Sequence, residues 1–406
     1  MAVDLLLDAM APTNTLWGNP AALRSAIESR GASVLKGLAN LADDVVDNNA
    51  RPRQVDRSGF RVGENLACTP GKVVFRNDLI ELLQYEPATT TVHEVPLLLS
   101  PPWINRYYIM DLAPGRSFVE WAVSHGHTTF TISYRNPEPG MGHLRLEDYL
   151  HDGLGTALEV VRAITGAPQA NLAGLCVGGT LAVVLLAWLA HDAGSATSPV
   201  RSLTLLNTLV DFSRPGRLGA FTDAESVARV EQRMAETGVL DGRDMAATFD
   251  ALRPNDLIWN YVGSSWLMGE PPPAFDILAW NADPTRIPAA THSEYLRSMY
   301  LENRLARNEL EMAGRRLDLG AVDTETYVLA AKEDHITPWL SSYATTGLLG
   351  GDVRFVLSSS GHIAGIVNPP GPKRTYWTND DLDPSPERWR AAATGHSGSW
   401  WDDWAT

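Results

Sequence analysis

The 406-residue sequence has only two cysteines, Cys68 and Cys176, which allow at most one disulfide. So few cysteines in a chain of this size are typical of reducing compartments, so we expect a cytoplasmic protein. The sequence also has no CxxC pair, no paired-histidine spacing, and no GxGxxG or Walker loop. We therefore expect neither a metal site nor a nucleotide cofactor. The first residues, MAVDLLLDAMAPTN, place no basic residue before their apolar part, so no secretory signal is expected.

Basic residues are also scarce, with 33 Lys and Arg against 48 Asp and Glu and a formal net charge of −15. Binding to nucleic-acid phosphates needs the opposite balance, so a nucleic-acid partner is not expected. The uncharged run 172–190 is long enough to be a candidate membrane span. However, the pair Gly178-Gly179 interrupts it, and strand and helix patterns alternate on both sides. These features favour a buried strand and helix of a parallel sheet, so no transmembrane segment is expected.

The same run has the pattern of a nucleophile elbow, in which a strand turns tightly into a helix around the reactive residue. Its letters GLCVGG place Gly174 and Gly178 two residues before and after Cys176. The tight turn leaves no room for a Cβ at these two positions. The positive end of the following helix would favour the thiolate, which is the nucleophilic form of cysteine. The alternative is a buried structural cysteine without a chemical role.

Strand and helix patterns alternate from residue 95 onwards, after a hairpin predicted over 73–75 and 80–85. An amphipathic apolar pattern over 146–164 predicts a helix between two of the strands. Helices that join parallel strands produce a sheet covered on both faces. An antiparallel start followed by a mostly parallel sheet of eight strands predicts the α/β-hydrolase fold. The strands expected after the hairpin are 95–100, 128–134, 171–175, 202–209, 326–331 and 353–357.

The gap between the strands ending at Leu209 and starting at Thr326 is too long for a simple crossover connection. It is rich in helix formers and aromatic residues, which predicts an inserted cap or lid. For any single aromatic residue there, a place in the small core of the insertion is the alternative to a substrate contact. We therefore expect four parts: a helical N-terminal segment over 1–70, a first core half over 71–210, the cap over 211–320, and a second core half with a Trp-rich tail over 321–406.

A cysteine nucleophile needs a base, and the base needs an orienting group. In this fold the nucleophile, acid and histidine follow one another along the chain. Asp334 follows the predicted strand 326–331, and His362 lies in a Gly-flanked loop after the last strand, so together with Cys176 they have the required order. Asp211 is a rival acid and His335 a rival histidine. Because His335 is adjacent to Asp334, its side chain is expected to point elsewhere.

An oxyanion hole needs two backbone N–H groups directed at the developing charge. Val177, the residue after the nucleophile, is expected to supply one. The other should come from the loop after the strand 95–100. Because Pro101 and Pro102 have no N–H, this donor must lie between Trp103 and Ile109.

Several segments together resemble the polyhydroxyalkanoate synthases, along nearly the whole chain. They are VVFRNDLIELLQY, PLLLSPPWINRYYIMDL, ISYRNP, GLCVGGT, LTLLNTLVDF, RPNDLIWNY, PPPAFDILAWNAD, EDHITPW, SSSGHIAGIVNPP and GSWWDDW. The resemblance implies polymerisation of (R)-3-hydroxyacyl-CoA into polyester with release of CoA, which is part of the substrate, so no separate cofactor is expected. It also implies a homodimer at the surface of polyester granules, which holds a growing polyester chain. Typical members carry a longer N-terminal region than the segment 1–70.

The resemblance also implies roles for individual residues. Cys176 holds the growing chain as a thioester and His362 deprotonates it. Asp334 either orients His362 or helps to activate the 3-hydroxyl group of the next monomer. Val177 and Ile109 match the oxyanion donors of the family. Further candidates for the substrate or lid region are Trp280, His335 and Asn105.

Two other functions remain open at the level of the sequence. A cysteine-type thioesterase or polyester depolymerase would let water reach the acylated Cys176. A catalytically silent granule-associated protein would keep the fold alone, although the intact Cys176, Asp334 and His362 argue against it. The GLCVGG box resembles synthases for short monomers and other segments resemble the medium-chain type, so the monomer length also stays open.

Overall fold

The computed structural model describes residues 2–191 and 197–405, and the chain forms two compact units. The smaller unit combines Met1–Arg61 with Arg243–Asp283, and the larger unit combines Val62–Gly242 with Pro284–Thr406. The division cuts across the expected cap 211–320, since 243–283 packs with the N-terminal helices. The four-part division of the chain stays a prediction.

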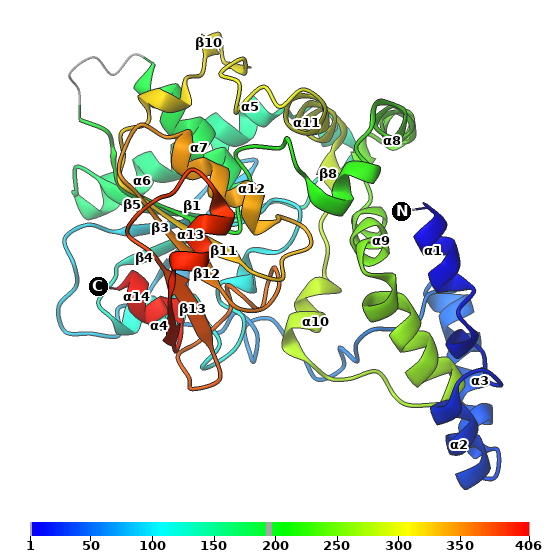
Figure 1. Cartoon of the computed structure of the whole chain (residues 1–406). Helices are drawn as coiled ribbons and strands as arrows, with labels where there is room; N and C mark the ends of the chain where they lie inside the picture. The colour runs from blue at the N-terminus through cyan, green and yellow to red at the C-terminus, as the bar shows by residue number, and fades with distance from the viewer. Residues whose placement is uncertain (1, 192–196, 406) are drawn as a thin grey trace. The chain divides into compact units, whose positions relative to one another are not determined.

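The larger unit is built around a ten-stranded sheet in the order β1-β2-β4-β3-β5-β6-β11-β12-β13-β14 (Figure 1). The six strands from β4 to β12 in this order run parallel, while β1, β2 and β13, β14 pair antiparallel at the two edges. This is the predicted α/β-hydrolase arrangement. The strands are β1 (Gly71–Arg76), β2 (Ile80–Tyr85), β3 (Leu97–Ser100), β4 (Thr129–Tyr134), β5 (Ala170–Leu175), β6 (Val200–Leu206), β11 (Thr326–Ala331), β12 (Val353–Ser358), β13 (Thr375–Thr378) and β14 (Thr394–Ser397).

The predicted count of eight strands was wrong, because the tail adds β13 and β14 to the edge of the sheet. Their sequences, TYWT and TGHS, carry no run of aliphatic residues, and their residues are half-buried or exposed. The apolar strands were easier to predict because central strands such as β3 are buried along their whole length. The strand predicted over 202–209 ends earlier, at Leu206, because Asn207 adopts a left-handed backbone with φ 44°.

Helices connect these strands and cover the sheet. The helix predicted over 146–164 is present, but a π-helical turn, η4 (Tyr149–Gly155), interrupts it between α5 (Leu146–Asp148) and α6 (Thr156–Thr165). The apolar run 172–190 forms β5 and the 14-residue helix α7 (Val177–Ala190).

Within 2–191 and 197–405, no helix has the length and apolarity needed to cross a bilayer. The other helices of four residues or more in this unit are α4 (Phe118–Ser124), η5 (Gly216–Ala220), α8 (Ala224–Thr237), α11 (Ala289–Tyr295), η8 (Leu296–Leu301), α12 (Trp339–Tyr343), η10 (Ala344–Gly347), α13 (Pro386–Ala392) and α14 (Trp400–Trp404). Two-residue strands also pair here, β7 (Val239–Leu240) with β8 (Ile287–Pro288) and β9 (Glu311–Met312) with β10 (Arg315–Arg316).

The C-terminal tail completes the core through its tryptophans. The ring of Phe118 in α4 stacks on Trp400 and meets Trp401 edge to face, with ring centroids 5.6 and 5.3 Å apart. All three side chains are fully buried, and Figure 1 shows α4 and α14 side by side. Burial of such large rings is a major contribution to stability. The Trp-rich tail is therefore part of the hydrophobic core of the larger unit.

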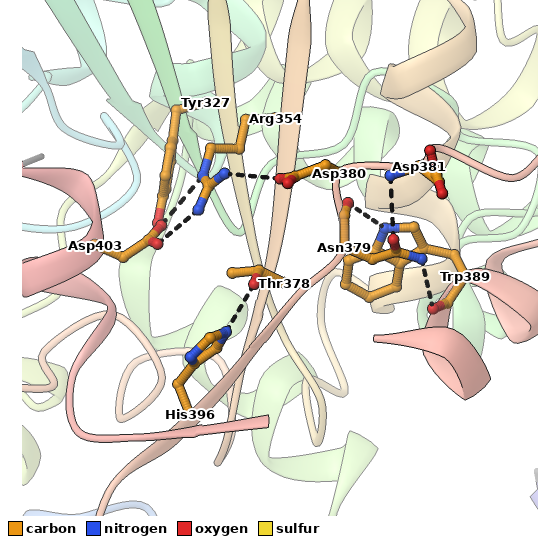
Figure 2. Close-up of polar contacts among 9 residues, drawn as sticks. All are labelled: Tyr327, Arg354, Thr378, Asn379, Asp380, Asp381, Trp389, His396 and Asp403. Carbon is orange, nitrogen blue, oxygen red and sulfur yellow. Dashed lines mark hydrogen bonds and ion pairs between the residues drawn. The ribbon is translucent and has the colours of Figure 1, made fainter. Parts of the chain in front are cut away.

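Polar contacts also hold the tail to the sheet, as Figure 2 shows. Arg354 of β12 pairs with Asp403 of α14 at 2.7 Å and with Asp380 at 3.2 Å. The hydroxyl of Tyr327 in β11 donates a hydrogen bond to Asp403 at 2.9 Å. Asp403 is thus held by two neighbouring central strands, which fixes α14 against the sheet.

The smaller unit is helical. The indole N–H of Trp266 in η7 donates to the buried Asp44 of α3 at 2.8 Å. A Cβ on Gly37 would lie 2.0 Å from the carbonyl oxygen of Trp266, so α3 and η7 approach closely because Gly37 has no side chain. The helices are α1 (Ala2–Ala9), α2 (Pro20–Glu28), α3 (Ala32–Asp47), α9 (Gly242–Leu252), η6 (Asn255–Trp259), η7 (Val262–Leu267) and α10 (Asp276–Asn281).

Candidate active site

Cys176 lies at the turn between β5 and α7, with φ 52° and ψ −122°. This left-handed backbone is uncommon for a residue with a side chain and is a feature of sharp strand-to-helix turns. The N–H of Cys176 donates to the carbonyl of Leu206 in β6 at 2.9 Å, which ties the turn to the neighbouring strand. The side chain is 7% exposed.

The glycines around Cys176 are required by close backbone contacts. A Cβ on Gly174 would lie 2.4 Å from the Cα of Gly179, and one on Gly178 would lie 2.2 Å from the carbonyl oxygen of Ser100. Both distances are far below van der Waals contact. Gly179, which the sequence analysis did not single out for the turn, would place a Cβ 2.0 Å from the hydroxyl of Thr208.

We expect Gly178→Ala to lower the free energy of unfolding by about 3 kcal/mol, because its methyl group meets the backbone of Ser100 and Pro101. The matched control is Gly347→Ala, at a position in the same unit where a Cβ meets nothing within 4 Å. Urea denaturation of both variants measures the difference. A Gly178→Ala protein as stable as Gly347→Ala would show that the close approach to β3 does not constrain the turn.

Asp334 and His362 meet at the carboxyl ends of β11 and β12. The Nδ1–H of His362 donates to Asp334 Oδ2 at 2.6 Å, and both residues are buried. The other Asp334 oxygen accepts the backbone N–H groups of Ile336 and Thr337 at 2.8 and 2.9 Å, and the Thr337 hydroxyl donates to Oδ2 at 2.7 Å. The carboxylate is thus held rigidly, and it fixes the orientation of the His362 ring.

The bond to Asp334 occupies Nδ1 of His362, and the side chain of Cys176 lies near enough to the ring to affect its pKa. Burial alone would lower the pKa of His362. The attraction of the Asp334 carboxylate and the hydrogen bonds to Asp334 and Cys176 outweigh burial and raise the pKa of His362 to about 10. For Asp334, burial favours a higher pKa, but attraction to His362 and its hydrogen bonds hold the pKa below its ordinary value. An imidazolium at this place would stabilise negative charge on the Cys176 sulfur.

These shifts predict a pH-dependent contribution to stability. Because the folded pKa of His362 is raised, its contribution is fully present below pH 6.5 and is lost as the pH rises towards 10. The lowered pKa of Asp334 adds stability above pH 3.8 that is lost in acid. We therefore expect the difference in unfolding free energy between the wild type and His362→Gln to be largest near pH 6.5 and to shrink towards pH 10. Urea denaturation at the two pH values measures it, with His143→Gln, at an exposed histidine, as the control. A difference that stays constant over this range would contradict the pairing.

The two rival residues have other contacts. Asp211 accepts hydrogen bonds from the Asn303 side chain and the Ser213 N–H, both at 2.8 Å. His335 is half-buried beside Asp334, but the imidazole that bonds the Asp334 carboxylate is that of His362. The geometry therefore favours the expected pair over Asp211 and His335.

The two expected oxyanion donors lie in the segments that follow two neighbouring strands, β5 and β3. Val177 is the first residue of α7, where backbone N–H groups have no partner inside the helix. Ile109 ends the short helix η2 (Tyr107–Ile109) in the loop after β3, and β3 pairs directly with β5. The buried Asp111 holds this loop by accepting hydrogen bonds from the hydroxyls of Thr69 and Ser117 at 2.5 and 2.7 Å. The assignment of Val177 and Ile109 as donors remains a prediction.

Three aromatic side chains pack together, and two of them neighbour Cys176. Phe212, Tyr295 and Tyr300 pack edge to face, with ring centroids 5.0 to 5.8 Å apart. Burial raises the pKa of both tyrosines, and in each case the neighbouring Cys176 raises it further. Two tyrosine side chains therefore neighbour Cys176, of which Tyr295 is buried and Tyr300 is half-buried.

The remaining candidates are Asn105 and Trp280. Asn105 forms an isolated β-bridge with Pro284 in the loop after β3. Trp280 lies in α10 of the smaller unit. Their roles at the substrate remain predictions. In residues 2–191 and 197–405, no three His, Cys, Asp or Glu side chains are arranged to hold a metal ion.

Two contributors to the site were missed in the sequence. Thr337 lies in the segment EDHITPW, three residues after Asp334, where a hydroxyl can reach back to the carboxylate. Asn207 was placed inside a predicted strand, but its side chain donates to the carbonyl of His362 at 2.5 Å. Asparagine is enriched in left-handed backbone, so its place at the end of an apolar strand was a usable signal.

Comparison with known families gives two matches. Residues 1–122 match the family described as "Poly-beta-hydroxybutyrate polymerase (PhaC) N-terminus", and residues 111–369 match the alpha/beta hydrolase fold. The second match spans more than half of the chain and contains all three residues of the expected triad.

Curated relatives match almost the whole chain. A poly(3-hydroxyalkanoate) polymerase subunit PhaC of Rhizobium meliloti is 46% identical over 99% of this chain and 66% of its own length. The corresponding protein of Cupriavidus necator is 45% identical over 99% of this chain and 69% of its own length. Poly(3-hydroxyalkanoate) polymerase 1 of Ectopseudomonas oleovorans is 43% identical, with 99% and 71% covered. The chain thus spans about two thirds of the length of the curated relatives it matches.

Proposed function

This chain belongs to the poly(3-hydroxyalkanoate) polymerase family, and we propose that it polymerises (R)-3-hydroxyacyl-CoA into polyester with release of CoA. The observation that carries the proposal is the buried hydrogen bond between His362 and Asp334, with Cys176 at a nucleophile elbow near enough to affect the pKa of His362. This constellation serves acyl transfer through a covalent intermediate.

In the first proposed step, the Cys176 sulfur attacks the thioester carbonyl of the acyl-CoA. His362 accepts the thiol proton, and backbone N–H groups of Val177 and Ile109 stabilise the oxyanion. The bond from the carbonyl carbon to the CoA sulfur then breaks, and CoA leaves with the proton from His362. One thioester replaces another, so this step has little thermodynamic cost.

In the second proposed step, the 3-hydroxyl group of a hydroxyacyl unit attacks the acyl group held on Cys176. The hydroxyl proton passes to His362, an oxygen ester forms, and the bond to the Cys176 sulfur breaks. Asp334 keeps the His362 ring in the orientation in which it can exchange this proton. An oxygen ester is more stable than a thioester, which drives the transfer forward.

Water competes with the hydroxyl group for the acylated Cys176, and its attack would give a thioesterase or depolymerase. We expect the packed rings of Phe212, Tyr295 and Tyr300, of which the two tyrosines neighbour Cys176, to limit the access of water and so to favour transfer to the hydroxyl group. Attack by water remains the second candidate reaction, which product analysis separates from polymerisation.

We further propose that the protein works in the cytoplasm as a homodimer at the surface of polyester granules, with no cofactor besides the CoA of its substrate. The support is the resemblance of its segments to the polymerases along nearly the whole chain. Sedimentation of the purified protein measures the oligomeric state. Its recovery with washed polyester particles, compared with albumin as a control, measures the association with granules.

The proposed activity is tested by measuring thiol release from (R)-3-hydroxybutyryl-CoA and collecting insoluble polyester from the same reaction. CoA release together with polymer supports the polymerase. CoA release with only free 3-hydroxybutyrate indicates the hydrolytic reaction. If neither appears with this substrate or with a longer (R)-3-hydroxyacyl-CoA, the proposed activity is wrong for this chain.

A further inference from the structure

The three residues after β6 contact every element that carries the proposed triad. The N–H of Asn207 donates to the carbonyl of Leu329 at 2.8 Å, in the strand β11 that leads to Asp334. The hydroxyl of Thr208 donates to the carbonyl of Cys176 at 3.3 Å. The carbonyl of Leu209 accepts the Thr180 hydroxyl at 2.8 Å, in the first turn of α7. One short segment therefore links the elbow, the strand before the acid and the loop of the histidine.

The link to the histidine is the side chain of Asn207. Its Nδ2 donates to the backbone carbonyl of His362 at 2.5 Å, and Asn207 is completely buried. The two residues are 155 positions apart, so this contact is part of the tertiary structure and not of a local turn. The amide bonds the backbone of His362 itself, so it connects the end of β6 directly to the residue that carries the imidazole.

Asn207 holds this position at an energetic cost. Its φ of 44° is in the left-handed region. Its Oδ1 is buried and has no hydrogen-bond partner among the described residues, which is unfavourable for a buried acceptor. Strained and under-satisfied residues of this kind concentrate at functional sites, where the surrounding structure maintains them.

We propose that Asn207 is a positioning residue that holds His362 in place for proton exchange with Cys176. The inference rests on the proposed function only in taking these two residues as the reacting pair. Asp334 fixes the rotation of the ring through Nδ1, while Asn207 fixes the place of the backbone from which the ring projects. Without Asn207, the His362 loop keeps its bond to Asp334 but loses its direct connection to the β6 end.

The test measures alkylation of Cys176 by iodoacetamide, in a Cys68→Ser background, between pH 6.5 and 10. Asn207→Asp keeps the shape of the side chain and removes the donor, and Asn207→Gly keeps the left-handed backbone at no steric cost. We expect both variants to be alkylated about 10- to 100-fold more slowly near neutral pH, with a changed pH profile, because the pair is misplaced. In turnover of (R)-3-hydroxyacyl-CoA we expect a lower kcat with little change in KM. Alkylation needs no acyl-CoA, so it remains informative if the protein is not a polymerase.

Asn368→Asp is the matched control. Asn368 is equally buried, its Oδ1 is likewise unpartnered among the described residues, and its Nδ2 donates at 3.1 Å to Ser358 instead of the triad. We expect this variant to keep the wild-type rate and pH profile of alkylation. The proposal is overturned if folded Asn207→Gly is alkylated as fast as the wild type. It is also overturned if alkylation of Asn368→Asp is slowed by the same factor as that of the Asn207 variants. Thermal unfolding of each variant confirms that folded proteins are compared.

Discussion

Replacing Cys176 with alanine is expected to reduce CoA release from (R)-3-hydroxyacyl-CoA by on the order of 10⁴-fold or more, because it removes the sulfur on which we propose that the acyl chain is held. The fold is expected to survive. Alanine also carries a Cβ, so the backbone at φ 52° is strained in the same way, and the hydrogen bond from the Cys176 N–H to Leu206 does not involve the sulfur. Thiol release and insoluble polymer are measured in the same reaction.

Cys68→Ala is the natural control for this experiment. Cys68 is the other cysteine of the chain, it is half-buried in the same unit, and it belongs to none of the contacts of the elbow. Its substitution should leave the rate near that of the wild type. Substantial CoA release by Cys176→Ala would mean that the acyl group is held elsewhere, and the elbow assignment would then be wrong.

The central part of the fold was predictable because its strands contain runs of buried, mostly apolar residues. The strands β5, β11 and β12 were predicted to within one residue at either end, since a buried parallel strand leaves a continuous apolar run. β13 and β14 were not predicted, because their residues are half-buried or exposed and their pairing depends on contacts with β12. The π-helical turn η4 was also missed, since Leu150, Leu154 and Leu158 across it still recur four residues apart, as in an α-helix.

The residues of the triad were predictable because each follows a strand, and parallel strands bring their carboxyl ends to one edge of the sheet. The contacts that support these residues were harder to predict from the sequence. The hydrogen bond from Asn207 to His362 joins the end of β6 to the loop after β12, and no local sequence pattern predicts it. The joint packing of 1–61 with 243–283 was not predicted either, since contacts between segments almost 200 residues apart have no signature in a single sequence. The places of the expected triad residues after their strands could thus be predicted from the sequence. The contacts that hold these residues in position could not.

His362→Gln is expected to slow both acylation and chain elongation by about 10²- to 10⁴-fold, the usual contribution of a general base. Glutamine keeps a polar side chain of similar length but cannot exchange a proton. Both proposed steps begin with the loss of a proton, from the Cys176 thiol in the first and from the monomer hydroxyl in the second. The burst of CoA release measures acylation, and the later steady release with polymer formation measures elongation.

The two rates distinguish the possible roles of the residues around Cys176. If acylation is normal in His362→Gln and elongation alone is slow, another group activates the thiol, and His335 is the next residue to substitute. His396→Gln, at a half-buried histidine that bonds Thr378 in the tail, should leave both rates unchanged. In Asp334→Asn the imidazole keeps a polar neighbour at Nδ1 but loses the negative charge that holds its pKa high. Equal losses in both steps would then assign Asp334 to orienting His362, whereas a loss confined to elongation would assign it to the hydroxyl of the incoming monomer.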